Sequence, residues 1–434
     1  MKNTIMAALL MAGIATTVSA QSGTNSPYSQ FGLGIISDQA TGFNRGMNGV
    51  GIAFHESDQV NCLNPASYAA VDSLTFLFDM GASGQLTNFK EGNVSRNAKN
   101  ADFEYAVGLF RAARNVGVSF GIIPFTNIGY NYSSSSKVGG STYTTTTTYS
   151  GEGGVHEVYL GAGWQPIKGL SVGANIAYLW GSYTKSSSVS FSDSYANPSL
   201  RSYTATIYSY KLDFGAQYTY QLDKKNALSL GVTYSPGHSI GGNPRAIIGT
   251  TNTMTSTTTY DTLSTVNGSK LSLKIPTAVG VGVMWNRDNR IKVGVDYTYQ
   301  NWGALEEPML LQQGGNTYYS MQSGQYMDRH KFNVGCEITP QPMARGYFKR
   351  IRYRAGAAYT TPYYKVNGAD GPKEYSASLG FGFPISDNMY KRTSYLNISG
   401  QWVHTDGLTM RENTFRINIG FTFNGRWFEK WKAE

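Results

Sequence analysis

Alternation of apolar and polar residues recurs along the chain in about fourteen segments, and it constrains the fold more than any other feature. In the last segment, Phe415, Ile417 and Ile419 alternate with Arg416 and Asn418. Successive side chains of a β-strand point to opposite faces, so each segment predicts a strand with one apolar face. The expected strands are 74–84, 101–111, 115–132, 155–165, 170–183, 204–221, 227–236, 275–286, 290–302, 329–339, 349–360, 373–384, 393–404 and 413–424.

The connections between these strands alternate in length. Short turns follow the even-numbered strands, and long polar connections, among them 133–154, 237–274 and 303–328, follow odd-numbered ones. An even number of antiparallel strands with short turns at one edge and long loops at the other is typical of an outer-membrane barrel. A β-sandwich offers no reason for this alternation. We therefore predict an all-β fold, a transmembrane antiparallel barrel of about 14 strands spanning 73–424, with both termini in the periplasm.

The composition fits a sheet that faces two environments. The chain has 31 Tyr, 20 Phe and 50 Gly, so it is rich in aromatic residues. Past residue 20 it has no run of about 18 apolar residues, which excludes a bundle of membrane-spanning helices. The formal net charge is +9, but basic residues do not cluster with stacking aromatics. We therefore exclude nucleic acid as a partner and expect contact with anionic headgroups of outer-membrane lipids.

The first twenty residues predict export. Lys2 precedes an apolar core of about 5–16, and the small residues 18–20 suit cleavage before Gln21. The nearest cysteine is Cys62, so the cleaved chain does not begin with a cysteine that could carry a lipid. We expect residues 1–20 to be a signal peptide and the protein to reach the bacterial outer membrane.

The alternation also assigns side chains to faces. Ile291, Val293 and Val295 are expected to face lipid, because a charge at the bilayer midplane costs roughly 2–4 kcal/mol. The charged lumen side chains then include Lys292, Asp296, Arg352 and Arg354. They either pair with one another and with an internal plug, or one of the two arginines binds a substrate carboxylate. Trp164, Trp285 and Trp302 lie at strand ends and predict an aromatic girdle.

Residues 21–72 precede the first strand and show no strand pattern of their own. They contain the stretches GLGII and GMNGVGIAF and the triplet Asn64-Pro65-Ala66. Such a segment ahead of a barrel is expected to fold into the lumen as a hatch, with glycines allowing close backbone packing. Residues 425–434 are expected to form a periplasmic tail.

The stretch RGMNGVGIAFHESDQVNCLNPASYAAVDSLTF, residues 45–76, resembles the hatch of the FadL family. That family consists of outer-membrane transporters for long-chain fatty acids and other hydrophobic compounds. The resemblance implies a hatch that blocks the barrel, a low-affinity external groove, and lateral exit through a gap at a kinked third strand. It implies passive uptake by a protein that is not an enzyme and uses no cofactor.

The third predicted strand contains Pro124 followed by Phe125. Proline cannot donate to a sheet ladder and is found at edges or bulges, whereas a closed barrel has no edge. Pro124 therefore indicates either a lateral opening in the wall or the point where the strand leaves the bilayer. If substrate exits laterally, the Asn64-Pro65-Ala66 turn is expected to lie against Pro124 and Phe125, and the strand to lose ladder bonds there.

Other chemistry finds little support in the sequence. The five histidines have no metal-binding spacing, and Ser399 does not share a strand face with His404, so we predict neither a metal site nor a hydrolase. Cys336 alternates with lipid-facing residues, so we expect it and Cys62 to remain free thiols. The alternative function is a FadL-like, PorV-like barrel that transports nothing and acts as a scaffold for secretion or surface proteins.

Overall fold

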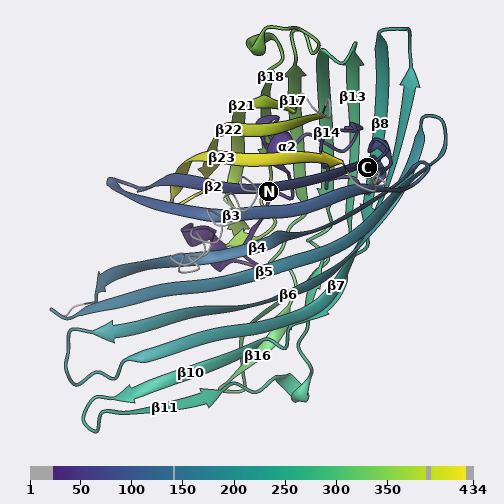
Figure 1. Ribbon diagram of the computed structural model, residues 1–434. Coiled ribbons are helices and arrows are strands. Elements are labelled where there is room, and N and C mark those ends of the chain that lie inside the picture. Colours follow the sequence, from purple (N-terminus) through teal and green to yellow (C-terminus); the bar gives the residue numbers. More distant parts are fainter. Residues whose placement is uncertain (1–22, 140–141, 388–391, 427–434) are drawn as a thin grey trace, which may run out of the picture.

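The computed structural model describes residues 23–139, 142–387 and 392–426. Fourteen antiparallel strands form a closed barrel, in which each strand pairs with its neighbours in the chain and the last pairs with the first, β23 with β2 (Figure 1). The predicted fold class and strand number are thus confirmed. The predicted signal peptide (1–20) and most of the predicted C-terminal tail (425–434) lie outside the described residues.

The barrel strands are close to the predicted segments, several of them longer. They are β2 (Thr75–Glu91), β3 (Val94–Ala113), β4 (Val116–Lys137), β5 (Thr144–Ile167), β6 (Leu170–Phe191), β7 (Ser199–Gln221), β8 (Asn226–Ser235), β13 (Ala278–Arg287), β14 (Ile291–Gln300), β17 (Arg329–Ile338), β18 (Arg352–Thr360), β21 (Lys373–Asp387), β22 (Arg392–Asp406) and β23 (Arg411–Arg426).

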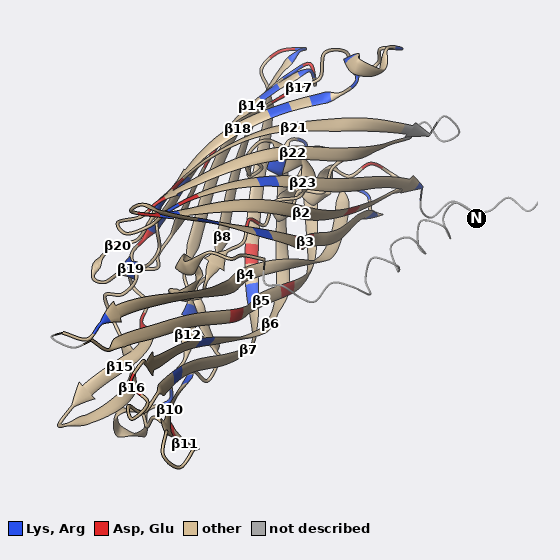
Figure 2. Ribbon diagram, turned by 90° about the vertical axis from the view of Figure 1, so that its left-hand side faces the viewer, with Lys and Arg blue, Asp and Glu red and all other residues tan. Residues whose placement is uncertain are grey.

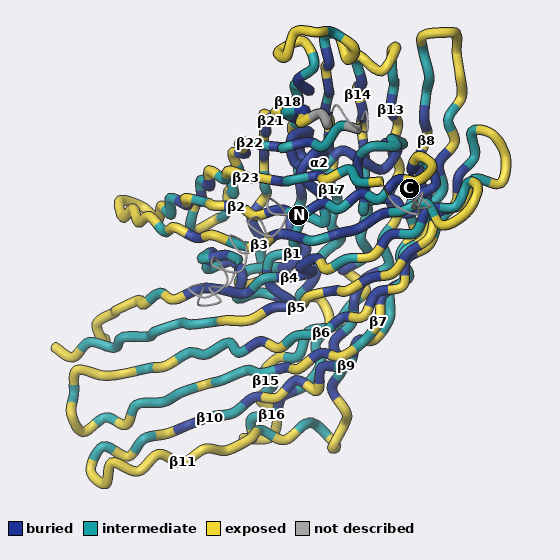
Figure 3. Tube along the Cα trace, in the orientation of Figure 1, coloured by how far each residue is buried: buried dark blue, intermediate teal, exposed yellow. Residues whose placement is uncertain are grey.

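The side chains examined on the strands lie on the faces that the sequence predicts. On β23, Phe415, Ile417 and Ile419 are exposed on the outer surface, and Asn418 between them is buried. Lys292, Asp296, Arg352 and Arg354 are likewise buried inside the barrel. Buried residues concentrate in the middle of the molecule, and the far ends of the long hairpins are exposed (Figure 3). This alternation is what an outer wall in lipid and a packed polar interior require.

The long connections differ from the prediction, because much of their length is strand. The 133–154 connection is the end of β4 and the start of β5, joined by hydroxyl pairs such as Ser133–Thr148 and Ser135–Thr146. Both faces of these extensions meet water, so the alternation that marks the rest of each strand is missing. Threonine is β-branched and still favours the extended backbone.

The remaining connections carry short elements of their own. β10 (Arg245–Asn252) extends the sheet beside β7, and β11 (Thr257–Thr262) pairs with β10. The other elements are β9 (His238–Gly241), η3 (Val266–Gly268), β12 (Leu273–Ile275), β15 (Glu307–Gln313), β16 (Asn316–Gln322), η4 (Tyr347–Lys349), β19 (Lys365–Val366) and β20 (Ala369–Asp370). No helix of the described residues is both long and apolar enough to cross a membrane.

Two tryptophans and two cysteines test further expectations from the sequence. Trp302 was expected in the aromatic girdle but is buried, because it packs against Tyr326 of its own connection and Tyr363 of the connection after β18. Trp164 is exposed as predicted. Cys62 and Cys336 are both free, which confirms the thiol prediction.

Residues 23–72, which we call the N-terminal segment, lie against the inner face of the barrel. The segment contains η1 (Pro27–Gln30), β1 (Ile35–Ile36), α2 (Gly42–Gly46) and η2 (Pro65–Ala70). α2 packs against β21, β22 and β23, whereas η2 packs against β5, β6 and β7. Its two helical turns therefore contact opposite parts of the wall.

A lysine in place of Ile417 tests the lipid-facing surface. We expect Ile417→Lys to lower the free energy of unfolding by roughly 2–4 kcal/mol, because the charge would face the bilayer. The measurement is the urea midpoint of the protein folded into lipid vesicles. Leu408→Lys, in the exposed connection before β23, is the matched control and should change the midpoint little. Equal effects of the two lysines would contradict the assignment.

Candidate functional site in the barrel lumen

The Asn64-Pro65-Ala66 triplet forms the start of η2. Asn64 caps the turn, since its Oδ1 accepts from the Ala66 backbone N–H at 3.0 Å, and Pro65 occupies the first position, where its fixed φ suits a helix. Asn64 Nδ2 also donates to the Ile52 carbonyl at 2.8 Å. The triplet thereby joins η2 to the earlier part of the N-terminal segment.

The wall beside this turn is built of glycines. A Cβ atom at Gly163, Gly173 or Gly215 would collide with Asn64 or Pro65. These glycines lie on β5, β6 and β7, so the turn sits on those strands. Phe125 accepts a hydrogen bond from the Ser37 backbone N–H at 3.0 Å, and Pro65 and Phe125 line the same cavity. The expected contact of the triplet with Pro124 and Phe125 stays a prediction.

Four ion pairs connect the N-terminal segment to four different strands. Arg45 binds Glu104 of β3 at 2.8 Å, and Asp38 binds Lys331 of β17 at 2.6 Å. Glu56 binds Lys292 of β14 at 2.7 Å, and Asp58 binds Arg352 of β18. Three of these strands, β14, β17 and β18, are successive neighbours in the wall, and β3 lies apart from them. Residues 38–58 are therefore fixed from two sides.

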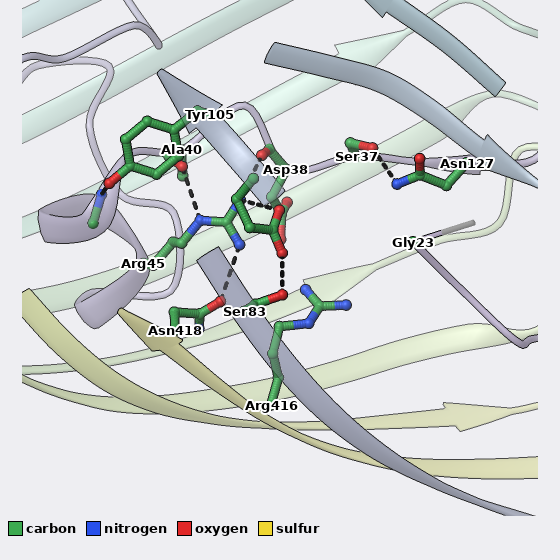
Figure 4. A network of polar contacts seen from close by, with 12 residues as sticks. Gly23, Ser37, Asp38, Ala40, Arg45, Ser83, Tyr105, Asn127, Arg416 and Asn418 are labelled. Atoms are coloured by element: carbon green, nitrogen blue, oxygen red, sulfur yellow. Dashed lines mark hydrogen bonds and ion pairs between the residues drawn. The ribbon is translucent and has the colours of Figure 1, made fainter. Parts of the chain in front are cut away.

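Arg45 occupies the centre of a larger polar network. It also donates to the Ala40 carbonyl at 2.9 Å and to Asn418 Oδ1 at 3.1 Å (Figure 4). Ser83 donates to the same Glu104 that pairs with Arg45. Charge-assisted hydrogen bonds of this kind are stronger than neutral ones, so Arg45 is a principal anchor of the segment.

The four lumen residues predicted from sequence all take part in this network. Glu337 accepts from Lys292 at 3.1 Å and from Arg354 Nε at 2.7 Å. Asp296 accepts from the backbone N–H groups of Gly51 and Ile52 at 2.6 and 2.9 Å. The pairing interpretation therefore describes the structure. The partners on the N-terminal segment, Asp38, Arg45, Glu56 and Asp58, were missed, although charges inside a glycine-rich stretch are a usable signal.

The wall is interrupted between β3 and β4. Their ladder ends at the pair Ala106–Ile122, and β4 continues for fifteen residues, 123–137, without β3. β3 follows β2 instead, and the two hairpins diverge (Figure 1). On its other side β4 stays paired with β5, with a bulge between Pro124 and Thr126. The lost ladder bonds begin beside Pro124, and β3 and β4 leave a gap.

Residues 23–37 of the N-terminal segment close this gap. β1 pairs with β4 through Ile35–Asn127 and Ile36–Thr126. Further along the strand, Ser29 exchanges hydrogen bonds with the backbone of Gly129. Toward β3, Asn25 donates to the Lys99 carbonyl at 3.2 Å. The closure is therefore made by a short backbone pairing and a few neutral hydrogen bonds.

A cavity of about 190 Å³ lies inside the wall behind the gap. Its apolar lining includes Ile36, Leu63, Phe125, Ile275 and Trp302. Its charged lining is balanced, with three carboxylates and three cations: Asp38, Asp213, Asp296, Lys211, Arg329 and Lys331. In the described residues no group of three or more His, Cys, Asp or Glu side chains is placed to hold a metal ion.

Aromatic residues cover the cavity toward the long connections. The ring centroids of Trp302 and Tyr363 are 4.4 Å apart, and those of Phe31 and Tyr364 are 5.2 Å apart. Tyr363 also donates its hydroxyl to the carbonyl of Gly34. This cover and the gap closure share the same part of the N-terminal segment, so displacing one would disturb the other.

Asp38, His55 and Cys62 are among the groups of the N-terminal segment whose pKa values are shifted. Lys331 lowers the pKa of Asp38, which therefore stays ionised well into acid. Burial lowers the pKa of His55, whose Nδ1 lies 2.8 Å from Gln217 Oε1. Burial also raises the pKa of the Cys62 thiol to about 12, so little thiolate is present at neutral pH.

The fold is that of the FadL-type outer-membrane barrels. The Ralstonia pickettii toluene transporter TbuX superposes with a TM-score of 0.58 at 14% identity, covering 90% of this chain and 99% of that one. A Pseudomonas aeruginosa FadL homologue gives 0.60 at 11%, covering 89% and 99%. The Pseudomonas putida toluene transporter TodX gives 0.58 at 13%, covering 91% and 100%. Identities this low show the fold alone.

The chain belongs to the BamG family, which it matches over residues 1–434. The expected FadL resemblance is therefore correct for the fold, while the family is a different one. No curated protein sequence matches the chain.

Replacement of Arg45 tests the anchoring of the segment. Arg45→Met leaves Glu104 buried without its cation, which costs about 3–5 kcal/mol. We expect the segment to open far more often and Cys62 to react at least about 100-fold faster with a maleimide, measured in a Cys336→Ala background. Arg411→Met breaks an exposed ion pair and serves as the control. Unchanged labelling of Cys62 in Arg45→Met would contradict the anchoring role.

His55 gives the docked segment a pH dependence. Its folded pKa is depressed, so the folded state resists the proton that the unfolded chain accepts near its ordinary pKa of about 6.5. Stability should therefore fall as the pH drops below about 6.5. We expect the urea midpoint to fall less between pH 7.5 and 5.5 in His55→Gln, which keeps a partner for Gln217, than in the native protein. Identical pH profiles would exclude this role.

Proposed function

We propose that the protein is a passive outer-membrane route for hydrophobic small molecules, which leave through the β3–β4 gap. The observation that carries the proposal is the ladder that ends at Ala106–Ile122 and is closed only by residues 23–37. A closed barrel gains nothing from an unpaired edge in its wall, since edges expose backbone groups that need partners. The unpaired edge has a function if residues 23–37 can leave it and so open the wall to substrate.

The two parts of the N-terminal segment differ in how firmly they are held. Residues 38–58 carry the four ion pairs with the wall, whereas residues 23–37 contain no charged residue at all. In the described part of the chain, residues 23–37 form no ion pair, although Ser26 donates to Glu412 and the Gly32 backbone contacts Glu307 and Lys185. Their other hydrogen bonds are neutral, and each contributes only about 0.5–1.5 kcal/mol net. The proposed gate is therefore residues 23–37, with residues 38–58 as its fixed anchor.

The cavity lining suggests the substrate class. Phe125 and Ile36 lie on its apolar side and at the gap, and polar side chains such as Gln300 and Thr298 also line it. A molecule with an apolar body and a neutral polar group would match both parts. The related folds include proteins named as toluene transporters and a monoaromatic hydrocarbon channel, which fits a small apolar body. Long-chain fatty acids are the largest substrates that the proposal includes.

A second candidate function is a scaffold that transports nothing and holds secretion or surface proteins. Membership of the BamG family rather than the FadL family favours it. The cavity, at about 190 Å³, is also below the roughly 300–1,000 Å³ of typical ligand pockets, and it is charged. The hairpins of β4–β7, with β10 and β11 beside them, project far from the rest of the barrel and offer a broad protein-sized surface (Figure 1).

A reversible crosslink across the gap separates these functions. Ser37 Oγ accepts from Asn127 Nδ2 at 3.0 Å, so Ser37→Cys with Asn127→Cys places two thiols side by side in a Cys62→Ala, Cys336→Ala background. We expect oxidation to abolish uptake of radiolabelled toluene or palmitate by cells, because the gate cannot leave, and reduction to restore it.

The matched control ties the anchor instead of the gate. Asn48 donates to Ser376 Oγ at 2.8 Å, and Asn48→Cys with Ser376→Cys should leave uptake unchanged when oxidised. Transport would be excluded, and the scaffold favoured, if the native protein and the gate variant gave no more uptake than cells lacking the protein. For the gate variant this would have to hold in both redox states. Uptake that the gate crosslink does not alter would exclude only the lateral route.

A further inference from the structure

Charge is distributed unequally between the two edges of the barrel. The edge with short turns comprises residues 72–74, 111–115, 165–169, 222–226, 286–291, 339–351 and 424–426, and we call it the short-turn rim. It carries eleven Lys or Arg residues and three Asp residues. The opposite edge comprises 88–102, 131–152, 184–206, 237–274, 301–328, 361–374 and 405–412, with twelve basic and twelve acidic residues. Most of the formal charge of +9 therefore lies at the short-turn rim.

The basic residues of the short-turn rim surround the barrel. Each of the five described connections at this edge contributes at least one, and the connection after β17 contributes three (top of Figure 2). The residues are Arg111, Arg114, Lys168, Lys224, Lys225, Arg287, Arg290, Arg345, Lys349, Arg350 and Arg426. Among the described ion pairs, none neutralises Lys168, Lys224, Lys225, Arg287, Arg345 or Lys349.

Large apolar side chains accompany these charges. Ile167 is exposed next to Lys168, and Phe348 is exposed beside Lys349. Leu222 is also exposed, two residues before Lys224. The connection after β17 is also fixed to the outer wall, because Tyr353 donates its hydroxyl to the Phe348 carbonyl at 3.2 Å. Tyr353 packs edge-on against the exposed Phe381 of β21, so this connection lies at the lipid-facing surface.

We propose that the short-turn rim binds the headgroups of anionic phospholipids in the adjacent leaflet. Apolar side chains next to cations match a bilayer interface, where rings and alkyl groups enter the acyl region and cations meet phosphates. The distribution around the barrel favours lipid over a protein partner, since lipid surrounds the whole perimeter and a partner covers one side. Each basic residue near an anionic surface contributes about 1 kcal/mol, so several act together.

The test compares two sets of six substitutions in otherwise intact protein. The rim variant carries Lys168→Gln, Lys224→Gln, Lys225→Gln, Arg287→Gln, Arg345→Gln and Lys349→Gln. The control variant removes the same charge from the opposite edge, at Lys90, Arg96, Lys99, Arg201, Arg245 and Lys270, all exposed. Each protein is reconstituted in nanodiscs of phosphatidylethanolamine and phosphatidylglycerol, extracted gently, and its retained lipid identified by native mass spectrometry.

We expect phosphatidylglycerol to be enriched at least about twofold over the bilayer composition with the native protein and the control variant, and not with the rim variant. Raising the salt from 0.1 to 1 M should reduce the enrichment, because the Debye length shrinks to about 3 Å. Equal retention by the rim and control variants would overturn the proposal. Absence of enrichment in the native protein, together with rim-dependent binding of an acidic periplasmic protein, would assign the surface to that protein.

Discussion

The pairing of buried charges across the lumen is the interaction on which the rest of the structure depends. Lys292 is held between Glu56 of the N-terminal segment and Glu337 of the wall, and Arg45 is held by Glu104. Removing one partner of such a pair leaves an uncompensated charge at a cost of about 3–5 kcal/mol. Wall and segment therefore require each other, and residues 38–58 function as part of the barrel core rather than as a loose insert.

The first part of the N-terminal segment is held by contacts other than ion pairs. Residues 23–37 have no charge and close the β3–β4 gap through backbone pairing, a few hydroxyls and aromatic packing. Most of these contacts are neutral, although Ser26 donates to Glu412 and the Gly32 backbone contacts Glu307 and Lys185. None of them is an ion pair, and a neutral hydrogen bond contributes only about 0.5–1.5 kcal/mol net. The boundary between the ion-paired part and this part falls at Asp38, one residue after the last contact with the gap.

The sequence predicts the parts of the fold that face two different solvents. Ile417 and Asn418 must point to lipid and lumen, so alternation locates β23 and its face. The extensions of β4 and β5 have water on both faces and carry no such pattern. Pro124 marks the break in the wall, but the two-residue β1 that fills it is too short for any periodicity. The partners of Arg352 and Lys292 depend on the path of a segment distant in sequence, which local patterns do not encode.

The balance of charge inside the barrel bears on what it can admit. The cavity carries three carboxylates and three cations; Lys211 and Lys331 are ion-paired, and Arg329 donates to Gln300 Oε1. A substrate carboxylate that paired with Arg352 would displace Asp58, and one that paired with Arg354 would displace Glu337. Either exchange replaces an existing pair and gains little, while the displaced group stays buried. A neutral polar group needs no such exchange and can use the amide and hydroxyl groups of the lining.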